Sequence, residues 1–260
     1  MSNQGNKSTY SVSQNFLTSR RVIRSLLRRT QITKADTVLE IGAGKGHITK
    51  ALAEVSGKVI SYEIDPVLYR RLATQLPPSV CLYQEDFLQC QLPKEPYQVF
   101  ANIPFSRTTE IIRKLTTGKR MPKAMWLVME KGAAKRFCGS PRESVSSLRI
   151  KPYFETKIVY YFAKEDFHPA PSVDTVLVEW IRKSEPDLPV EEQSEFEAFL
   201  RYSFSHGVYG AKALLTKRQI SVALHRAGFP MIGPSGNMQY VQWLCLFRCW
   251  KRFGRRISGK

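Results

Sequence analysis

The sequence has no uninterrupted apolar run of the roughly 18 residues that a membrane-spanning helix needs, so we expect no transmembrane segment. Its first residues contain no apolar signal core, which predicts a cytoplasmic protein. The five cysteines are odd in number, and no Cys-x-x-Cys pair occurs. This pattern argues against a zinc site and a disulfide framework, and it predicts reduced thiols and no bound metal.

Acidic side chains are missing from both ends of the chain. Residues 1–35 contain seven Lys or Arg and no Asp or Glu, and residues 201–260 contain eleven and none. The formal net charge is +18. A surface of this kind indicates a polyanionic partner, most simply nucleic acid, because each Lys or Arg near a phosphate releases counterions. The alternative is a soluble basic protein whose charges are only solvated.

What the sequence does contain is an alternation of short apolar strands with helical stretches. Five strands are predicted, at residues 37–41, 58–64, 79–85, 97–101 and 124–130. Helical spacing is found at residues 20–30, 47–55, 65–76, 108–118 and 131–139. This alternation predicts an α/β fold of the Rossmann-like kind, with a mostly parallel sheet and helices on both faces.

The pattern changes after about residue 150. Residues 156–163 and 174–181 form two strands with no helix between them, which predicts an antiparallel pair that completes a seven-stranded sheet. The acidic stretch 183–193 is typical of a linker that leads into a helix. We therefore predict a catalytic domain with a basic N-terminal arm at 1–182, and a small, all-helical, basic RNA-binding domain at 183–260.

The first strand ends in a glycine turn, Gly42-Ala43-Gly44-Lys45-Gly46. Ligands of an open parallel sheet bind outside the carboxyl ends of its strands, and glycine lets the backbone approach them closely. The dinucleotide pattern Gly-x-Gly-x-x-Gly is not met because position 47 is His. The turn, with Glu40 before it, favours S-adenosylmethionine; other nucleotides and a structural turn are the alternatives.

The next two strands also end in acidic residues. Glu63 stands 21 residues after Gly42, where a carboxylate can accept both ribose hydroxyls of a nucleoside. Asp86 follows the third strand and can accept from the exocyclic amine of a cofactor adenine, with Phe87 as an apolar contact. A solvated strand end is the alternative for each residue alone.

The fourth strand ends in Asn102-Ile103-Pro104-Phe105. The N6 amine of adenine is a poor nucleophile because its lone pair is delocalised into the ring. The Asn102 side-chain oxygen and the Ile103 carbonyl can accept both N–H bonds and draw the nitrogen toward tetrahedral geometry, which is catalysis by positioning. Pro104 stiffens the corner and Phe105 can stack on the ring. An ordinary turn is the alternative.

Together with Gln14-Asn15-Phe16-Leu17 and Phe167-His168-Pro169-x-Pro171-x-Val173-Asp174, these motifs resemble those of the ribosomal RNA adenine N6-methyltransferases. The resemblance is strongest to the bacterial Erm-type enzymes of macrolide, lincosamide and streptogramin B resistance. It implies a Rossmann-like methyltransferase domain that uses S-adenosylmethionine and releases S-adenosylhomocysteine. Two residues depart from the common pattern: Phe105, where many relatives have Tyr, and Thr175, where Ser is usual.

The resemblance also implies roles for particular residues. Phe105 and Phe167 would sandwich the target adenine, and Asn102 would lie between the adenine and the methyl donor. The implied cofactor-binding residues are Asn15, Leu17, Gly42, Ala43, Gly44, Glu63, Ile64, Asp86, Phe87 and Asn102. The implied partner is 23S rRNA, free or in early assembly intermediates, and the protein is expected to act as a monomer without an obligate protein partner.

Bases in a paired helix are out of reach of such an enzyme, so the target adenine must be unpaired or extruded. The cationic N-terminus, the basic stretch 107–123 and the C-terminal domain are the predicted phosphate-contacting surfaces. The candidate RNA-binding residues are Arg107, Arg113, Lys119, Arg120, Lys212, Lys217 and Arg218. By contrast, Trp243, Leu246, Phe247 and Trp250 are predicted to form a core, as are Cys245 and Cys249.

Three other functions stay open on the sequence. The first is a housekeeping transferase that dimethylates adenosines of 16S rRNA, whose usual Asn-Leu-Pro-Tyr differs from the Asn-Ile-Pro-Phe found here. The second is a nucleic-acid-binding protein that has kept the fold and lost catalysis; the intact Gly42, Glu63, Asp86 and Asn102 argue against it. The third is an NAD-dependent oxidoreductase, which His47 and the charge of +18 disfavour.

Overall fold

The computed structural model describes residues 15–233, 237–255 and 257; Gln14 of the N-terminal motif lies outside them. The chain divides into two units: Met1–Ala134 with Lys157–Arg182, and Lys135–Thr156 with Lys183–Lys260. The division after Arg182 coincides with the predicted boundary. Residues 135–156, which the sequence analysis assigned to the catalytic domain, instead group with the C-terminal helices because α6 (Val145–Ile150) packs against α7 (Gln193–His206).

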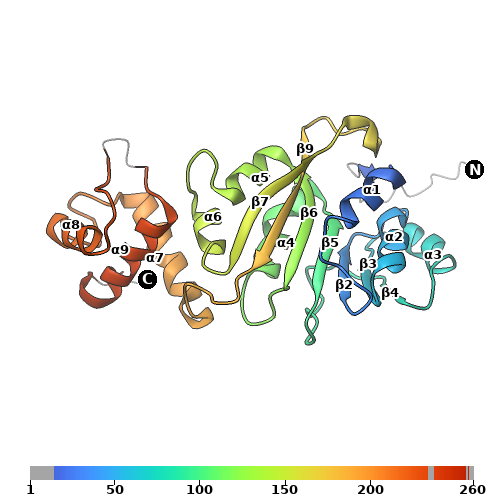
Figure 1. The fold of residues 1–260 in the computed structure, drawn as a ribbon, viewed down its shortest axis with the longest axis horizontal. Coiled ribbons are helices and arrows are strands. Elements are labelled where there is room, and N and C mark those ends of the chain that lie inside the picture. Colours follow the sequence, from blue (N-terminus) through green and yellow to red (C-terminus); the bar gives the residue numbers. More distant parts are fainter. Residues whose placement is uncertain (1–14, 234–236, 256, 258–260) are drawn as a thin grey trace, which may run out of the picture. The chain divides into compact units, whose positions relative to one another are not determined.

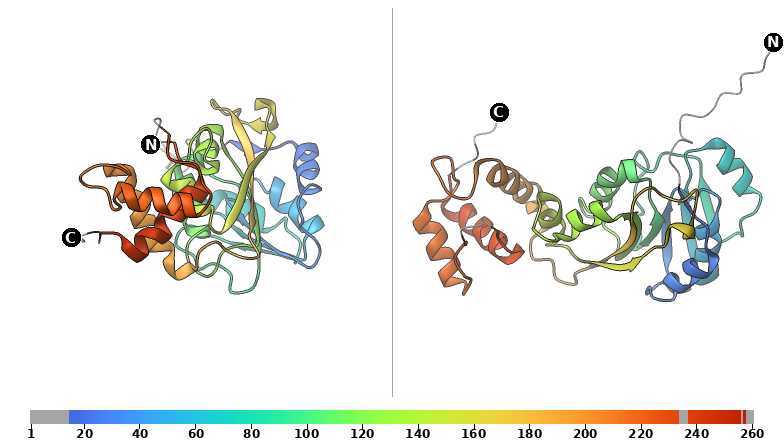
Figure 2. Two further views of the ribbon diagram at one scale, coloured as in Figure 1. Left: turned by 60° about the vertical axis from the view of Figure 1, so that its left-hand side comes forward. Right: turned by 90° about the horizontal axis from the view of Figure 1, so that it is seen from above.

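The first unit is built on a seven-stranded sheet with helices on both faces (Figures 1 and 2). The strand order is β4-β3-β2-β5-β6-β9-β7. The strands are β2 (Thr37–Ile41), β3 (Lys58–Tyr62), β4 (Val80–Tyr83), β5 (Gln98–Asn102), β6 (Ala124–Glu130), β7 (Phe154–Tyr161) and β9 (Thr175–Arg182). Strands β2 to β6 pair in parallel and β9 runs antiparallel to β6, so the prediction of a mostly parallel seven-stranded sheet is confirmed.

Most helices of this unit follow the strands as predicted. They are α1 (Arg20–Leu27), α2 (His47–Val55), α3 (Pro66–Ala73), α4 (Thr108–Leu115) and α5 (Lys131–Cys138), whose last residues pass into the second unit. Helix α3 begins at an Asp65 N-cap whose carboxylate accepts from the backbone N–H groups of Val67 and Leu68. Apolar residues of α1 and α2 pack with alternate residues of the strands, such as Val38, Phe100 and Trp126, into one buried cluster.

The order of the strands reverses at β2. The chain proceeds from β2 to β3 and β4 on one side, and then to β5 and β6 on the other. The carboxyl ends of β2 and β5 therefore diverge into a crevice, which is where open parallel sheets bind ligands.

A second, two-stranded sheet was missed by the sequence analysis. Strand β1 (Phe16–Leu17) pairs antiparallel with β8 (Phe167–His168), and this brings together the two motifs that lie farthest apart in the sequence. Thr18 continues the contact because its N–H donates to the Asp166 carbonyl at 2.9 Å. Strands of two residues have no periodicity, so only the tertiary structure reveals this pairing.

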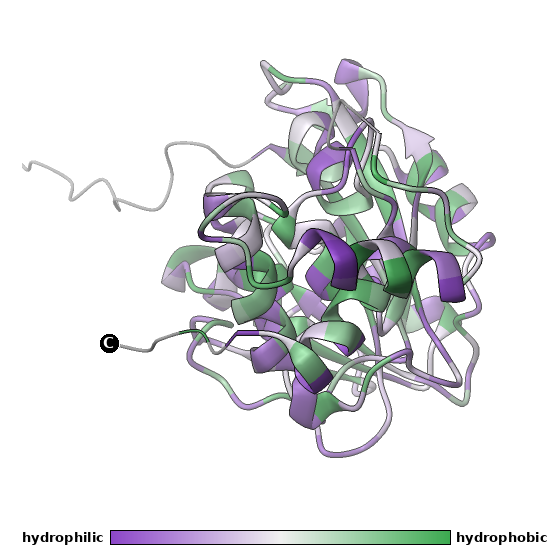
Figure 3. Cartoon of the chain, turned by 90° about the vertical axis from the view of Figure 1, so that its left-hand side faces the viewer, coloured by the Kyte–Doolittle hydropathy of each residue, from purple (hydrophilic) through white to green (hydrophobic). Residues whose placement is uncertain are grey.

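The second unit contains α6, α7, α8 (Lys217–Arg226) and α9 (Tyr240–Phe253). In Figure 3 its helices carry hydrophobic and hydrophilic residues side by side, as amphipathic helices do. Trp243, Leu246 and Phe247 are buried, as predicted, and Trp250 packs against Phe199 with ring centroids 5.4 Å apart. Cys245 and Cys249 are half-buried against α8 rather than part of the core. No helix among the described residues is both long and apolar enough to cross a membrane.

Candidate active site

A cavity of about 310 Å³ opens at the carboxyl ends of β2, β3, β4 and β5. We call it the strand-end cavity. Predicted residues from four strand ends line it, together with one from the segment before β1. Those predicted for the cofactor are Asn15, Gly42, Gly44, Glu63, Ile64, Asp86, Phe87 and Asn102. Those predicted for catalysis are Asn102, Ile103, Pro104 and Phe105. The topology thus gathers into one space residues that lie up to 90 positions apart in the sequence.

The glycine turn forms one wall of the strand-end cavity. Gly44 has φ of +56°, and a Cβ there would come within 2.7 Å of the Phe16 ring, so both conformation and space require glycine. Gly42 also has positive φ, +78°, but a Cβ at that position would meet no atom within 4 Å. The turn therefore lies closely against Phe16 and is open at Gly42.

Glu63 is almost completely buried beneath this wall, at 1% exposure. One carboxylate oxygen accepts from the Gly44 N–H at 2.7 Å and the other from the Asp65 N–H at 2.8 Å. Burial raises the pKa of Glu63, and these two N–H groups oppose the rise by stabilising the charged form. Each oxygen keeps a further lone pair, so the carboxylate can still accept from a ligand hydroxyl.

Glu40, two residues before Gly42, does not line the cavity. It belongs to β2 and is buried, and one carboxylate oxygen accepts from Thr49 Oγ1 at 2.7 Å and from Ser61 Oγ at 2.6 Å. Burial raises its pKa to about 8, because the charged form is poorly solvated there. Glu40 thus connects β2 to α2 and β3.

Asp86 and Phe87 lie on the loop after β4. Asp86 Oδ1 accepts from the Leu88 N–H at 2.9 Å, which fixes the carboxylate at the start of the loop. Phe87 is buried and contacts Tyr62 edge-on, with centroids 5.9 Å apart. The loop is held from outside by Lys114 of α4, whose ammonium donates to the carbonyls of Phe87 at 2.7 Å and Leu88 at 2.9 Å, and to that of Cys90. Neither Tyr62 nor Lys114 was singled out from the sequence.

Asn102 ends β5 with its amide held in a single orientation. Its Nδ2 donates to the backbone carbonyl of Asn15 at 2.7 Å. Its Oδ1 is buried and has no hydrogen-bond partner among the described residues. A buried acceptor without a partner is costly, about 1–3 kcal/mol, so an unpaired oxygen at a cavity wall marks a place where a ligand donor belongs. The sequence analysis did not foresee that Asn15 orients this amide.

Three predicted residues lie outside the wall of the strand-end cavity. Leu17 and Ala43 are buried, at 2% and 6% exposure, and do not line the cavity. Phe167 is 4% exposed and packs edge-on against Phe162, with centroids 5.3 Å apart. The pairing of β8 with β1 places it opposite Leu17. Its proposed stacking on a base stays a prediction, one that requires the ring to become accessible.

The predicted RNA-binding residues are all exposed. Arg107 lines the mouth of the strand-end cavity and forms an ion pair with Glu110. Arg113 belongs to α4, and Lys119 and Arg120 follow it in the first unit. Lys212, Lys217 and Arg218 belong to the second unit. The described residues contain no cluster of His, Cys, Asp or Glu that could hold a metal ion.

The sheet order and a nucleoside-sized cavity at its switch point define the first unit as a Rossmann-like methyltransferase domain. The family model described as "Ribosomal RNA adenine dimethylase" matches residues 5–221. The chain belongs to this family of S-adenosylmethionine-dependent rRNA adenine N6-methyltransferases.

Individual relatives cover nearly the whole chain. An rRNA adenine N-6-methyltransferase of Bacillus anthracis is 33% identical over 99% of this chain and 95% of its own length. One of Limosilactobacillus reuteri is 31% identical over 96% and 100%. The crystal structure of the 23S rRNA methyltransferase ErmE has a TM-score of 0.78 at 28% identity, covering 91% of this chain and all of ErmE. A dimethyladenosine transferase from Plasmodium falciparum has a TM-score of 0.71 at 22% identity over 91% of this chain and 98% of its own, a likeness of fold alone.

Proposed function

We propose that this protein methylates the N6 atom of one adenine in bacterial 23S rRNA and thereby confers resistance to macrolides, lincosamides and streptogramin B. The observation that carries the proposal is the unpaired Oδ1 of Asn102 in the wall of the strand-end cavity, next to Pro104 and Phe105. An exocyclic amine is a donor that this oxygen can accept from. Phe105, half-buried beside it, offers an aromatic face to the same base.

The residues of the site suit the methyl donor as well as the target. Glu63 would accept hydrogen bonds from the ribose hydroxyls of S-adenosylmethionine, and Asp86 would accept one from its adenine amine. Gly42 and Gly44 would lie beside this methyl donor. The cofactor supplies an electrophilic methyl group. The chain supplies position: the carbonyl of Asn15 fixes the Asn102 amide, and Oδ1 holds an N–H of the target so that the nitrogen lone pair can point at the methyl group. No side chain is required as a nucleophile.

The 23S assignment has a specific rival in the 16S rRNA dimethyladenosine transferases. Two observations favour 23S: the loop is Asn-Ile-Pro-Phe rather than Asn-Leu-Pro-Tyr, and the likeness to ErmE is 28% in sequence. The dimethyladenosine transferase from Plasmodium falciparum shares only the fold at 22% identity. A non-catalytic nucleic-acid-binding protein is the third possibility; the unpaired Oδ1 of Asn102 argues against it.

We further propose that the protein acts in the cytoplasm as a monomer, on free 23S rRNA or early assembly intermediates. The exposed cations of the second unit and of the stretch 107–120 would contact phosphates.

The test uses S-adenosylmethionine with a labelled methyl group on two substrates, naked 23S rRNA and small-subunit particles. Label in the 23S rRNA supports the proposal, and label only in the 16S rRNA overturns it. Primer extension then locates the adenine, and expression in a sensitive bacterium should raise the inhibitory concentration of a macrolide. Absence of S-adenosylmethionine binding in calorimetry would favour the non-catalytic alternative.

A further inference from the structure

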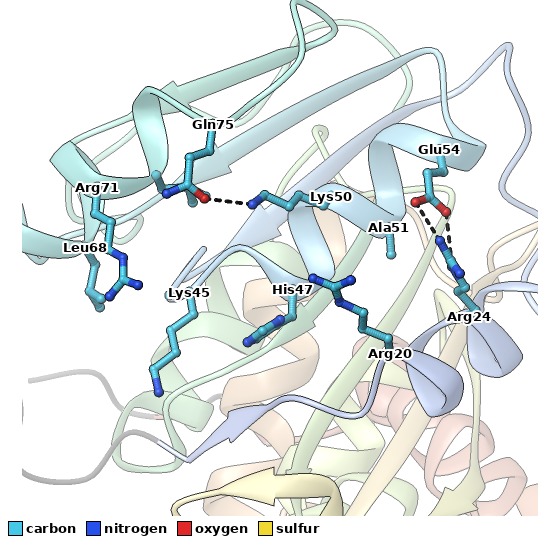
Figure 4. A pocket seen from close by; sticks show the side chains of 12 residues that line it. Arg20, Arg24, Lys45, His47, Lys50, Ala51, Glu54, Leu68, Arg71 and Gln75 are labelled. Atoms are coloured by element: carbon cyan, nitrogen blue, oxygen red, sulfur yellow. Dashed lines mark hydrogen bonds and ion pairs between the residues drawn. The ribbon is translucent and has the colours of Figure 1, made fainter.

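A second cavity, of about 350 Å³, lies in the first unit and shares Gly44 with the strand-end cavity (Figure 4). We call it the cationic pocket. Five Lys or Arg side chains line it, with a single carboxylate, Glu54. They come from four separate segments: Arg20 and Arg24 from α1, Lys45 from the glycine turn, Lys50 from α2, and Arg71 from α3. None of the seven individual candidate RNA-binding residues lies here, although Arg20 and Arg24 belong to the cationic N-terminus that the sequence predicts to contact phosphates.

Part of this charge is already engaged. Arg24 donates to both carboxylate oxygens of Glu54, at 2.9 and 3.2 Å, and Lys50 donates to the Gln75 side chain at 2.9 Å. By contrast, no hydrogen bond or ion pair to another described residue involves the guanidinium of Arg20 or Arg71. The pocket's carboxylate is therefore used, and two exposed guanidinium groups are left to meet an anion.

Two further features concentrate positive potential in the cationic pocket. His47 begins α2 there, so the positive end of the helix dipole adds to the side chains. The guanidinium of Arg20 lies beside the His47 ring in Figure 4. Burial lowers the pKa of His47, and the charges of Arg20, Lys45 and Lys50 lower it further. Arg20, Lys45 and Lys50 line the same pocket as this ring.

Lys45 connects the cationic pocket with the strand-end cavity. Its ammonium lies over the Phe16 ring, 4.9 Å from the centroid, and the same ring lines the strand-end cavity. Only Gly44 would therefore separate an anion in the cationic pocket from the strand-end cavity, where the proposed reaction takes place. The phosphates that flank a target adenine are anions that must come close to that space.

We propose that the cationic pocket is a binding site for backbone phosphates of the RNA strand that carries the target adenine. This inference rests on the proposed function. It adds a contact surface on the α1–α2–α3 edge of the first unit, separate from the stretch 107–120 and from the C-terminal helices. RNA is preferred over a small phosphate compound because the pocket adjoins the strand-end cavity and the whole chain carries +18.

The test compares two doubly substituted variants with the wild type. Arg20→Gln with Arg71→Gln removes the two guanidinium groups that have no partner. Arg21→Gln with Arg70→Gln removes the same charge from the same two helices, at exposed positions that do not line the pocket. Equilibrium binding of 23S and of 16S rRNA transcripts is measured separately for each protein over a range of salt concentrations.

The pocket variant should bind the rRNA that the enzyme methylates about tenfold more weakly than the wild type near physiological salt. The slope of log K against log salt should fall by about 1.5, because each phosphate contact contributes roughly 0.7–0.9. The control variant should change affinity by less than about threefold. Equal losses in the two variants would overturn the proposal, since charge alone would then explain the effect.

Calorimetry with S-adenosylmethionine and with inorganic phosphate tests the other anions. Unchanged affinity of the pocket variant for S-adenosylmethionine is the expected result. A loss confined to S-adenosylmethionine would overturn the proposal by assigning the pocket to the donor's carboxylate. The pocket variant could also lose the binding of inorganic phosphate while its RNA affinity stays unchanged. That result would overturn the proposal in favour of a small phosphate compound.

The outcome is separable from that of the proposed function. If only 16S rRNA is methylated, the 23S assignment fails, while the pocket is still judged by the affinity for 16S rRNA.

Discussion

The two cavities of the first unit share Gly44 but differ in electrostatic character. The strand-end cavity is lined by the carboxylates of Glu63, Glu85 and Asp86 and by an unpaired amide oxygen. The cationic pocket is lined by five cations and one carboxylate that is already paired. Acceptors suit hydroxyl and amine donors of a nucleoside, whereas guanidinium groups suit phosphates. One glycine turn thus separates the strand-end cavity, proposed to hold the reacting groups, from the cationic pocket. The pocket is proposed to hold the RNA backbone that delivers the target adenine.

The largest effect that could break this comparison is expected at Asn102. Replacing Asn102 with Ala removes the oxygen that we propose holds the target amine, so turnover should fall by about 10²–10³, by analogy with the loss of one preorganised transition-state contact. RNA affinity should stay nearly unchanged, because the cationic pocket is intact. Single-turnover methylation and RNA binding check the two halves separately.

Ser106→Ala is the matched control for Asn102→Ala, since Ser106 lines the same cavity at an exposed position. An active Asn102→Ala enzyme would remove the positioning role. A parallel loss of RNA affinity would show that the two cavities do not divide the work as described.

The next effect concerns the ring of Phe105. Phe105→Ala should lower kcat/KM by about ten- to hundredfold, because stacking of a base on an aromatic ring is worth roughly 1–3 kcal/mol. Phe105→Tyr keeps the ring and should stay within about threefold of the wild type. Steady-state kinetics on a 23S rRNA fragment measure both, and equal losses in the two variants would contradict stacking.

Gly44 is where the comparison can be sharpened, because it belongs to both walls. Gly44→Ala places a Cβ against the Phe16 ring and imposes positive φ on alanine, which alone costs about 1–2 kcal/mol. S-adenosylmethionine affinity should fall about tenfold, as measured by calorimetry. Gly42→Ala has the same backbone strain but no contact with Phe16. The difference in S-adenosylmethionine affinity between the two variants therefore measures the effect of the Cβ against the Phe16 ring. Identical affinities would mean that Phe16 moves away without cost.

The last effect concerns stability rather than activity, and it is the pH dependence that Glu40 contributes. Its pKa rises from an ordinary value of 4.5 to about 8 in the folded protein, so the folded state holds a proton that the unfolded state releases. The stability gained from this proton is full below about pH 4.5 and is lost as pH rises toward 8, by at most about 1.4 kcal/mol per pH unit.

Glu40→Gln should therefore flatten the pH dependence of the melting temperature between pH 5 and 8. Glu95→Gln, which removes an exposed carboxylate, controls for net charge. If Glu40→Gln and the wild type keep parallel curves over this range, Glu40 is ionised in the folded protein.

Local sequence patterns predicted the elements whose residues are strongly periodic. Strands β2 and β6 and helix α2 have the predicted bounds, because continuous apolar runs and a clear helical face define them. The strand ends were predicted to form the site because parallel strands place their carboxyl ends at one edge of the sheet. Gly42, Glu63, Asp86 and Asn102 lie at that edge. Topology alone was enough to bring them together.

Contacts between distant segments could not be predicted in this way. The six residues of α6 give too short a pattern, and their grouping with α7 depends on packing. Strand β1 exists only because β8 is beside it. The cationic pocket is similar, since Arg20, Lys45 and Arg71 are scattered in a chain that contains 40 Lys and Arg. Leu17, Ala43 and Phe167 belong to motifs at the site, yet they are buried and do not line the strand-end cavity.

The pairing of β1 with β8 has a consequence for how the enzyme is made. Phe16 and the carbonyl of Asn15 leave the ribosome early, but their partner strand is among the last parts of the sheet-containing unit to be synthesised. A nascent chain that has already assembled β2 to β6 still lacks β8, and therefore the strand pairing that holds Phe16 next to the glycine turn. We therefore expect the strand-end cavity to be completed only after β8 has been synthesised, and chains cut short before His168 should be inert rather than partly active.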